Sequence, residues 1–292
     1  MRKLSRNFKQ RLYFSIIGTP ILLGVIYTSH CPGCEWLFAA ILAVLISTAQ
    51  WEFYHITTSR GWQPVTYLGI ATTVAYVFVT LLITKHPNDA LWTSIPKVLF
   101  ILLLLLSFVK YFFRREEPIV NLSLTFFGIL YLAVPLSYMI DINYFFSHDN
   151  LNDGRWWLIY LIGVTKMTDI GAYLVGKLMG TKKLAPYISP GKTAEGALGG
   201  LLAAVLTSMG FYFLSTMFYG IALQLALIES LLLGLMIGIL AQIGDLSESL
   251  IKRDFGVKDS NQLPGIGGIL DLLDSLIFTV PFFYIYLELF RT

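Results

Sequence analysis

The sequence predicts an all-α integral-membrane protein, a polytopic bundle of about nine transmembrane helices with its N-terminus in the cytoplasm. Hydrophobic residues make up 56% of its 292 residues and charged residues only 13%, against about 25% charged in an ordinary soluble chain. The apolar residues form long runs, and roughly 20 such residues are what an α-helix needs to cross the hydrocarbon core of a bilayer. Basic residues gather in alternate connections between these runs.

The apolar runs place nine spans along the chain, which we treat as one membrane domain of residues 1–292. The predicted spans cover residues 12–29, 36–56, 64–84, 94–112, 119–141, 156–178, 194–216, 220–244 and 267–290. The first follows a basic stretch, as a secretory signal would, but without a convincing cleavage site, so we expect it to remain as a helix. N-terminal helices then occupy about 12–141, and the half from about 156 to 290 is expected to be catalytic.

The basic residues predict the orientation. With the N-terminus inside, the inner segments hold 16 of the 21 Lys and Arg residues, and the outer segments hold only Lys85, Arg155 and Arg291. Basic residues favour cytoplasmic connections, so this asymmetry supports both the span count and the orientation. The net charge of +3 is therefore a topology signal, and we expect no nucleic-acid partner.

The only cysteines, Cys31 and Cys34, lie in a CPGC stretch of the predicted first outer loop. Two thiols make an incomplete zinc site, and a pair in a tight Pro-Gly turn is more often incidental. We assign no function to them.

The inner connection before the seventh span contains Gly191-Lys192-Thr193, which resembles the end of a phosphate-binding P-loop. That motif needs a glycine five positions before Gly191, where this chain has Pro186. The P-loop interpretation therefore fails. We expect Thr193 to cap the seventh span instead, with Glu195 favoured in the first turn by the helix dipole.

The next inner connection, from Asp245 to Gly268, leads into two further carboxylates. Asp271 and Asp274 are three residues apart, so on one helix they share a face, with Ser275 one turn beyond Asp271. Placement at a helix N-terminus is worth only about 0.3–1 kcal/mol for each carboxylate, which does not offset two like charges one turn apart. Carboxylates near a membrane need a partner, water or a metal. The pair therefore predicts a site for a hard cation such as Mg²⁺.

Other charged residues allow more than one interpretation. Asp245 and Glu248 share a face at the end of the eighth span, and Asp245 is the stronger candidate because it lies closer to the apolar run. Glu248 can simply pair with Lys252 one turn on. Within the sixth span, Lys166 and Asp169 are three residues apart and could neutralise each other.

Two blocks of the catalytic half resemble the phosphatidate cytidylyltransferases, or CDP-diacylglycerol synthases. The first comprises Asp169, Gly171-Ala172-Tyr173, Gly176, Gly180, Ile188-Ser189-Pro190, Lys192-Thr193, Glu195-Gly196 and Gly199-Gly200; the second comprises Ser249, Lys252-Arg253, Lys258-Asp259, Pro264-Gly265, Gly267-Gly268, Asp271 and Asp274-Ser275. Together they span roughly residues 165–275. The N-terminal half resembles the family only in being a set of apolar helices.

The resemblance implies the reaction of CTP with phosphatidate, yielding CDP-diacylglycerol and pyrophosphate. It implies Asp245, Asp271 and Asp274 as catalytic ligands of Mg²⁺, with a second metal ion possible, and a catalytic role for Lys252. Substrate-binding roles follow for Asp169, Ser189, Lys192, Glu195, Ser249, Arg253, Lys258, Asp259, Gly267, Gly268 and Ser275. It also implies a homodimer, and the short loops suggest a bacterial plasma membrane with the site facing the cytoplasm.

We expect two different roles for the glycines of the two blocks. For Gly196, Gly199 and Gly200 we expect close helix packing, since small residues let membrane helices approach each other. For Gly267 and Gly268 we expect close approach to a phosphate at a helix N-terminus.

Two residues depart from the family pattern. Ile266 stands where the family usually has histidine, and Leu272 where it usually has arginine. Neither apolar side chain can transfer a proton or bind a phosphate. The phosphate of phosphatidate has a second pKa of about 6, so near pH 7 it is already largely ionised and needs no general base. We therefore expect activity to survive both replacements.

Three alternatives stay open at this stage. A transporter could use Lys166, Asp169 and Glu229 as an intramembrane path. A related CTP-dependent enzyme could act on another lipid acceptor, because an acyl-chain pocket is lined by ordinary apolar residues. A degenerate family member could have lost catalysis with Ile266 and Leu272.

Overall fold

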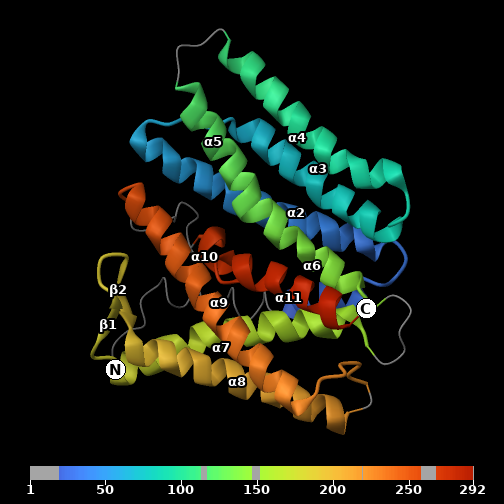
Figure 1. Cartoon of the computed structure of the whole chain (residues 1–292), viewed down its shortest axis with the longest axis vertical. Helices are drawn as coiled ribbons and strands as arrows, with labels where there is room; N and C mark the ends of the chain where they lie inside the picture. Colours follow the sequence, from blue (N-terminus) through green and yellow to red (C-terminus); the bar gives the residue numbers. More distant parts are fainter. Residues whose placement is uncertain (1–19, 113–116, 147–151, 219, 258–267, 292) are drawn as a thin grey trace. The chain divides into compact units, whose positions relative to one another are not determined.

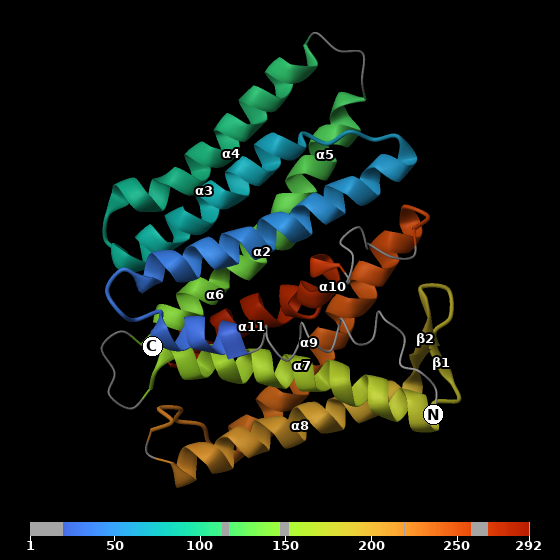
Figure 2. The ribbon, with the colours of Figure 1, turned by 180° about the vertical axis from the view of Figure 1, so that it is seen from behind.

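The computed structural model describes residues 20–112, 117–146, 152–218, 220–257 and 268–291. The chain divides into two compact units. The first unit comprises residues 1–140 and 255–272, and the second comprises residues 141–254 and 273–292. Figure 1 and Figure 2 show their helices from opposite sides.

The chain is an all-α, polytopic membrane protein, as predicted. Within the described ranges, eight helices are long and apolar enough to cross a membrane: Cys34–Arg60, Thr66–Lys85, Ala90–Tyr111, Pro118–Tyr144, Gly154–Met179, Ala194–Met217, Leu227–Asp254 and Ile269–Phe290. The first predicted span, 12–29, lies mostly outside the described residues, and residues 20–28 are helical.

The first unit is built from helices that follow one another along the chain; the last three form one continuous segment, Pro118–Tyr144, whose end from Asp141 belongs to the second unit. They are α2 (Cys34–Thr57) with the short η1 (Thr58–Arg60), α3 (Thr66–Lys85), α4 (Ala90–Tyr111), α5 (Pro118–Gly128), the π-helical η2 (Ile129–Ala133) and α6 (Val134–Tyr144). Local signals set their starts: Asp89 caps α4 by accepting from the backbone N–H of Leu91 at 2.9 Å, and Pro118 opens α5.

A neutral polar network, made of Gln50, Tyr54, Thr73 and Thr125, joins α2, α3 and α5 inside this unit. The amide of Gln50 donates to the hydroxyl of Tyr54, which donates to the carbonyl oxygen of Thr125, both at 2.7 Å. Thr73 donates to the other end of the Gln50 amide at 2.5 Å. All four side chains are buried, so each bond satisfies groups that water does not reach.

The second unit contains α7 (Gly154–Met179), a hairpin of β1 (Lys183–Ala185) and β2 (Ser189–Thr193), α8 (Ala194–Met217), α9 (Leu227–Asp254) and α11 (Leu276–Phe290). Helices α7 and α8 lie side by side in both views (Figures 1 and 2). The hairpin is antiparallel, with Lys183 opposite Thr193 and Ala185 opposite Ser189. The sequence predicts a loop here, and the hairpin takes its place.

The eighth predicted span, 220–244, is wrong at both ends, because the helix runs from Leu227 to Asp254. The helix begins later than predicted because the backbone before it is hydrogen-bonded to another segment: the N–H of Gln224 donates to Asn152 Oδ1 at 3.0 Å. Its end is extended because no helix breaker occurs before Gly256, whose φ of +71° suits glycine. The polar residues expected in a loop after 244 therefore lie on α9.

The last predicted span, 267–290, is interrupted. A short helix, α10 (Ile269–Leu273), ends before a turn at Asp274 and Ser275, and α11 then begins at Leu276. The expectation that Asp271 and Asp274 share one helical face is therefore wrong: the side chain of Asp271 is exposed, whereas Asp274 is buried.

Candidate active site

Small residues bring α7 and α8 close together. Gly196, Gly199 and Gly200 of α8 are buried. A Cβ atom placed on Gly200 would lie 3.0 Å from the carbonyl oxygen of Thr168 on α7. The packing role predicted for these three glycines is confirmed, and it holds α7 firmly against α8.

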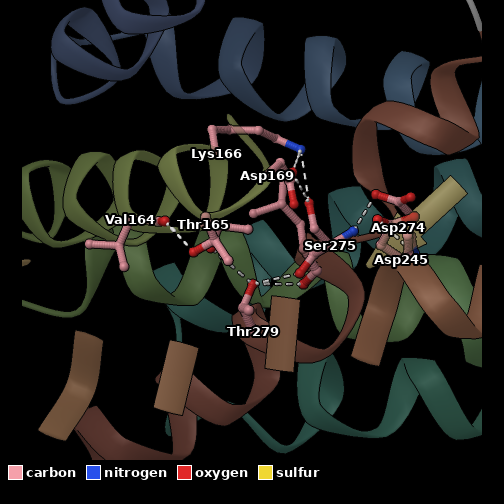
Figure 3. Close-up of polar contacts among 11 residues, drawn as sticks. Val164, Thr165, Lys166, Asp169, Asp245, Asp274, Ser275 and Thr279 are labelled. Atoms are coloured by element: carbon pink, nitrogen blue, oxygen red, sulfur yellow. Dashed lines mark hydrogen bonds and ion pairs between the residues drawn. The ribbon is translucent and has the colours of Figure 1, made fainter. Parts of the chain in front are cut away.

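Lys166 and Asp169 project from the middle of α7 toward the start of α11 (Figure 3). The Nζ atom of Lys166 lies 3.3 Å from Oδ2 of Asp169 and donates to Oγ of Ser275 at 2.9 Å. Ser275 Oγ donates to Asp169 Oδ2 at 3.0 Å. The pairing of Lys166 with Asp169, one of the alternatives from the sequence, is therefore present and includes Ser275 as a third partner.

Asp274 lies beside these groups in the turn before α11. Its Oδ1 atom accepts a hydrogen bond from the backbone N–H of Ser275, and the residue is only 6% exposed. The negative charges of Asp245 and Asp169 and the positive charge of Lys166 all act on it. Like charges held this close are unfavourable unless a cation compensates them.

Asp245 reaches the same turn from α9, because Gly244 permits close approach. A Cβ atom on Gly244 would collide with the carbonyl oxygen of Asp274 and lie 3.1 Å from the Cα atom of Ser275. Asp245 Oδ2 forms an ion pair with Lys192 Nζ at 2.7 Å, and the two side chains are 38% and 24% exposed. Lys192 of β2 thus pairs with Asp245 of α9, beside the turn that carries Asp274 and Ser275.

These six residues form what we call the charged cluster: Lys166, Asp169, Lys192, Asp245, Asp274 and Ser275. All belong to the second unit. Three carboxylates face two lysines, so the cluster has a formal excess of one negative charge. It is also partly open to solvent, since the side chains of Lys166 and Asp169 are 34% and 33% exposed.

The hairpin that carries Lys192 is tied to the start of α8. Thr193 Oγ1 accepts from the backbone N–H of Gly196 at 3.1 Å, so the predicted cap is confirmed. The carboxylate of Glu195 accepts from the backbone N–H groups of Thr181 and Lys182 at 3.0–3.2 Å. In this structure Glu195 therefore anchors the chain entering the hairpin.

The basic end of α9 makes internal contacts. Lys252 is buried and pairs with Glu248 at 2.6 Å, so the simple i,i+4 pair is present. Arg253 Nε donates to the carbonyl oxygen of Ile188 at 2.9 Å and so joins α9 to the turn of the hairpin. The catalytic role of Lys252 and the triphosphate role of Arg253 stay predictions.

The remaining predicted residues are distributed as follows. Ser189 in β2 and Ser249 in α9 are half-buried, Gly268 is buried just before α10, and Asp271 is exposed on α10 in the first unit. Lys258, Asp259 and Gly267 lie outside the described residues, as does Ile266. Leu272 is 49% exposed on α10.

The charged cluster could hold a metal ion only if substrate oxygens supplied some of its ligands. Among the described residues, no three Asp, Glu, His or Cys side chains converge closely enough to hold an ion by themselves. Mg²⁺, however, is commonly held by one or two carboxylates together with substrate phosphate oxygens. Asp245 and Asp274, brought together by Gly244, supply such a donor pair.

Lys166 is the member of the cluster that the predicted site omitted. From the sequence it is predicted only as a possible partner of Asp169. A charged side chain inside an apolar span was the signal that could have included it. Its contact with Ser275, 109 positions away in sequence, could not be foreseen from spacing.

Known proteins share this chain's sequence over nearly its whole length. A sequence profile of the Cytidylyltransferase family matches residues 9–290. Phosphatidate cytidylyltransferase of Chlamydia muridarum is 32% identical over 290 residues, covering 96% of this chain and 93% of the relative. That of Synechocystis sp. is 30% identical over 306 residues, covering 96% of each. That of Bacillus subtilis is 40% identical over 198 residues, covering 66% and 67%.

The family profile takes in both compact units and every residue of the charged cluster. The resemblance noted in the sequence thus extends beyond the two signature blocks to the apolar N-terminal helices. The chain belongs to the cytidylyltransferase family.

Proposed function

We propose that this protein is a phosphatidate cytidylyltransferase, which converts CTP and phosphatidate into CDP-diacylglycerol and pyrophosphate for phospholipid synthesis. The observation that carries the proposal is the charged cluster formed by two helices, a strand and a turn of a membrane protein of this family. A reaction between a membrane lipid and a soluble nucleotide needs a polar site that both can reach. Phosphate-binding cations and carboxylates are the groups that the chemistry requires.

In the proposed reaction, a phosphate oxygen of phosphatidate attacks the α-phosphorus of CTP. A new P–O bond forms, the bond between the α- and β-phosphates breaks, and pyrophosphate leaves with the electron pair. The attacking oxygen is already largely ionised near pH 7, so no side chain has to remove a proton. Catalysis then depends on positioning and on neutralising phosphate charge.

Lysines of the charged cluster are suited to that neutralisation. Lys192 and Lys166 are each paired with a carboxylate; the side chain of Lys166 is 34% exposed, whereas the Nζ atom of Lys192 is buried. An arriving phosphate can bind either lysine beside its present carboxylate partner, because an ammonium group carries three donors. We assign Lys192 and Lys166 to the substrate phosphates, and Ser275 and Asp169 to holding Lys166 in place.

The carboxylates of the charged cluster are assigned to Mg²⁺, with Asp245 and Asp274 as its protein ligands, and the ligand role of Asp271 stays a prediction from the sequence. When bound, the ion supplies positive charge to the phosphates and compensates the repulsion between the two aspartates. Asp245 would hold the ion, and Lys192, its present partner at 2.7 Å, would then be available to the nucleotide.

For the orientation, we propose a cytoplasmic N-terminus, with the charged cluster on the cytoplasmic side of a bacterial plasma membrane. The excess of Lys and Arg in the predicted inner connections supports this orientation. Those connections would attract both anionic substrates. A homodimer remains the expectation drawn from the family resemblance.

The test is turnover of labelled CTP by the purified protein in lipid vesicles, with and without phosphatidate and Mg²⁺. We expect lipid-linked CMP and pyrophosphate in equal amounts, and no product after chelation of divalent cations. Product with an alcohol or a different lipid phosphate, but none with phosphatidate, would assign the other-acceptor alternative. Complete absence of pyrophosphate with every acceptor would contradict the proposed catalytic activity and would favour a transporter or a degenerate family member.

The Ile266→His variant separates the last two outcomes. We expect this change to be unnecessary, because the proposed reaction needs no proton transfer from that position. Turnover only after the replacement would show that the natural chain had lost catalysis.

A further inference from the structure

A buried carboxylate in the first unit, outside both signature blocks, contacts the segment that enters α10. Glu52 lies on α2 and is only 1% exposed. In the sequence it is the only carboxylate between Glu35 and Asp89, a stretch of mostly apolar residues. An acidic side chain inside a membrane span is costly, so its position calls for a functional explanation.

Both oxygens of Glu52 accept hydrogen bonds from the start of α10. Oε1 accepts from the backbone N–H of Ile269 at 3.0 Å, and Oε2 accepts from that of Leu270 at 2.9 Å. The first N–H groups of a helix have no partner within the helix. Glu52 satisfies two of them from 217 and 218 positions away, and it fixes the backbone immediately before Asp271.

The other end of the same connection is also held by α2 and the turn after it. The hydroxyl of Ser59 donates to the carbonyl oxygen of Phe255 at 2.8 Å. The ring of Phe255 meets Phe53 and Trp62 edge-on, with centroids 6.3 and 5.7 Å apart. Phe53 is fully buried and directly follows Glu52. All these residues belong to the first unit.

The region from Glu52 to Trp62 therefore fixes residue 255 and residues 269–270, the two ends of a connection whose interior carries Lys258, Asp259, Gly267 and Gly268. A serine or asparagine within the connection itself would satisfy the same helix start without burying a charge. A carboxylate brought from a distant helix does more, because its charge-assisted bonds also fix where that helix start lies.

We propose that Glu52 is a positioning residue of the active site, which acts through α10 to hold Asp271 in place for catalysis. The inference rests on the proposed function and on the catalytic role that the family resemblance implies for Asp271. It assigns a role to the N-terminal helices, which the signature blocks do not include. Glu52 does not itself touch substrate.

The experiment compares Glu52→Gln and Glu52→Asp with the wild-type full chain in lipid vesicles. Glutamine keeps the size but replaces one acceptor with a donor that repels a backbone N–H. Aspartate keeps the charge but shortens the reach. A small displacement of a catalytic group can lower a rate about 100-fold. We expect Glu52→Gln to lower kcat by 10- to 100-fold with the KM for CTP changed less than threefold, and Glu52→Asp to recover part of the loss.

A second readout measures positioning without any turnover. Hydrogen exchange followed by mass spectrometry should show the peptide containing Ile269 and Leu270 exchanging at least tenfold faster in Glu52→Gln. The matched control is Gln50→Leu. Gln50 is a buried polar residue on the same helix, and its hydrogen bonds described above go to the neutral network. We expect that control to leave exchange in this peptide and turnover per folded protein unchanged.

The two readouts separate the possible failures. A wild-type protein without turnover would contradict the proposed function, and the exchange measurement would still decide whether Glu52 fixes α10. Unchanged exchange in Glu52→Gln would overturn the inference. So would equal losses of turnover in Glu52→Gln and Gln50→Leu, because that result would show a general loss of stability.

Discussion

The two compact units contain polar networks of opposite character. In the first unit, Gln50, Tyr54, Thr73 and Thr125 are neutral and buried, and their hydrogen bonds join three helices. In the second unit, the charged cluster contains carboxylates and lysines, several of them about one-third exposed. The first network joins groups that are shielded from water, whereas several charged side chains of the second are in contact with solvent.

This difference separates a structural role from a chemical one. A buried neutral network gains hydrogen bonds without the desolvation cost of an ion, so it can stabilise helix packing. Charged groups on membrane helices are costly, and partial exposure lowers that cost. Substitutions in the two networks should therefore affect different measurements.

The largest effect is expected from Asp274→Asn, which should lower kcat by at least 100-fold. A neutral amide binds Mg²⁺ poorly and no longer compensates Lys166. Loss of one preorganised electrostatic group costs about 100- to 1,000-fold in comparable sites. The assay is pyrophosphate release, with membrane insertion measured in parallel.

The matched control is Asp89→Asn, which changes an aspartate to asparagine at the cap of α4. Asparagine caps a helix about as well as aspartate, so turnover should stay at the wild-type level. Near-normal turnover in Asp274→Asn would remove that carboxylate from the catalytic assignment and weaken the contrast between the networks.

A smaller loss, about tenfold in kcat/KM, is expected from Gly244→Ala. The added methyl group would collide with the carbonyl oxygen of Asp274 and force α9 away from the turn. Overpacking of this kind typically costs about 1–3 kcal/mol. Gly210→Ala is the control, since nothing lies within 4 Å of the added methyl group. Equal behaviour of the two variants would contradict the close approach.

The smallest effect on turnover is expected from Tyr54→Phe. It removes the hydroxyl that joins Gln50 to the backbone of Thr125, and leaves buried polar groups without a partner. The loss should be about 1–3 kcal/mol of folding stability, with turnover per folded protein unchanged. Thermal unfolding in detergent measures the first and the CTP assay the second. A tenfold loss of turnover at full stability would show that the neutral network also serves the reaction.

Much of the fold could be predicted because hydrophobic runs directly report membrane spans. The described helices match the predicted spans from 36–56 to 194–216 within several residues. The predicted boundaries were wrong where a helix continues into polar residues, because hydrophobicity alone marks only the end of the apolar run. The helix α9 continues through Asp245 and Lys252 because i,i+4 pairs keep polar residues helical, and the sequence interpretation had ended it at residue 244.

The site was only partly predictable for a related reason. The spacing of Asp245, Asp274 and Ser275 identified candidates, and the family resemblance added Asp169 and Lys192. Spacing could not show that Asp274 is buried at a turn while Asp271 is exposed. Contacts such as those between Lys192 and Asp245, or Glu52 and α10, depend on tertiary packing, which local periodicity does not encode.

The turn at Asp274 and Ser275 has a consequence for biogenesis. The last span, Ile269–Phe290, enters the bilayer carrying Asp274, and an aspartate within an isolated span is costly to insert. Its compensating lysine, Lys166, is on α7, which the ribosome completes much earlier. Synthesis order thus supplies the counter-ion first, and stable insertion of the C-terminal segment becomes dependent on helices already in the membrane.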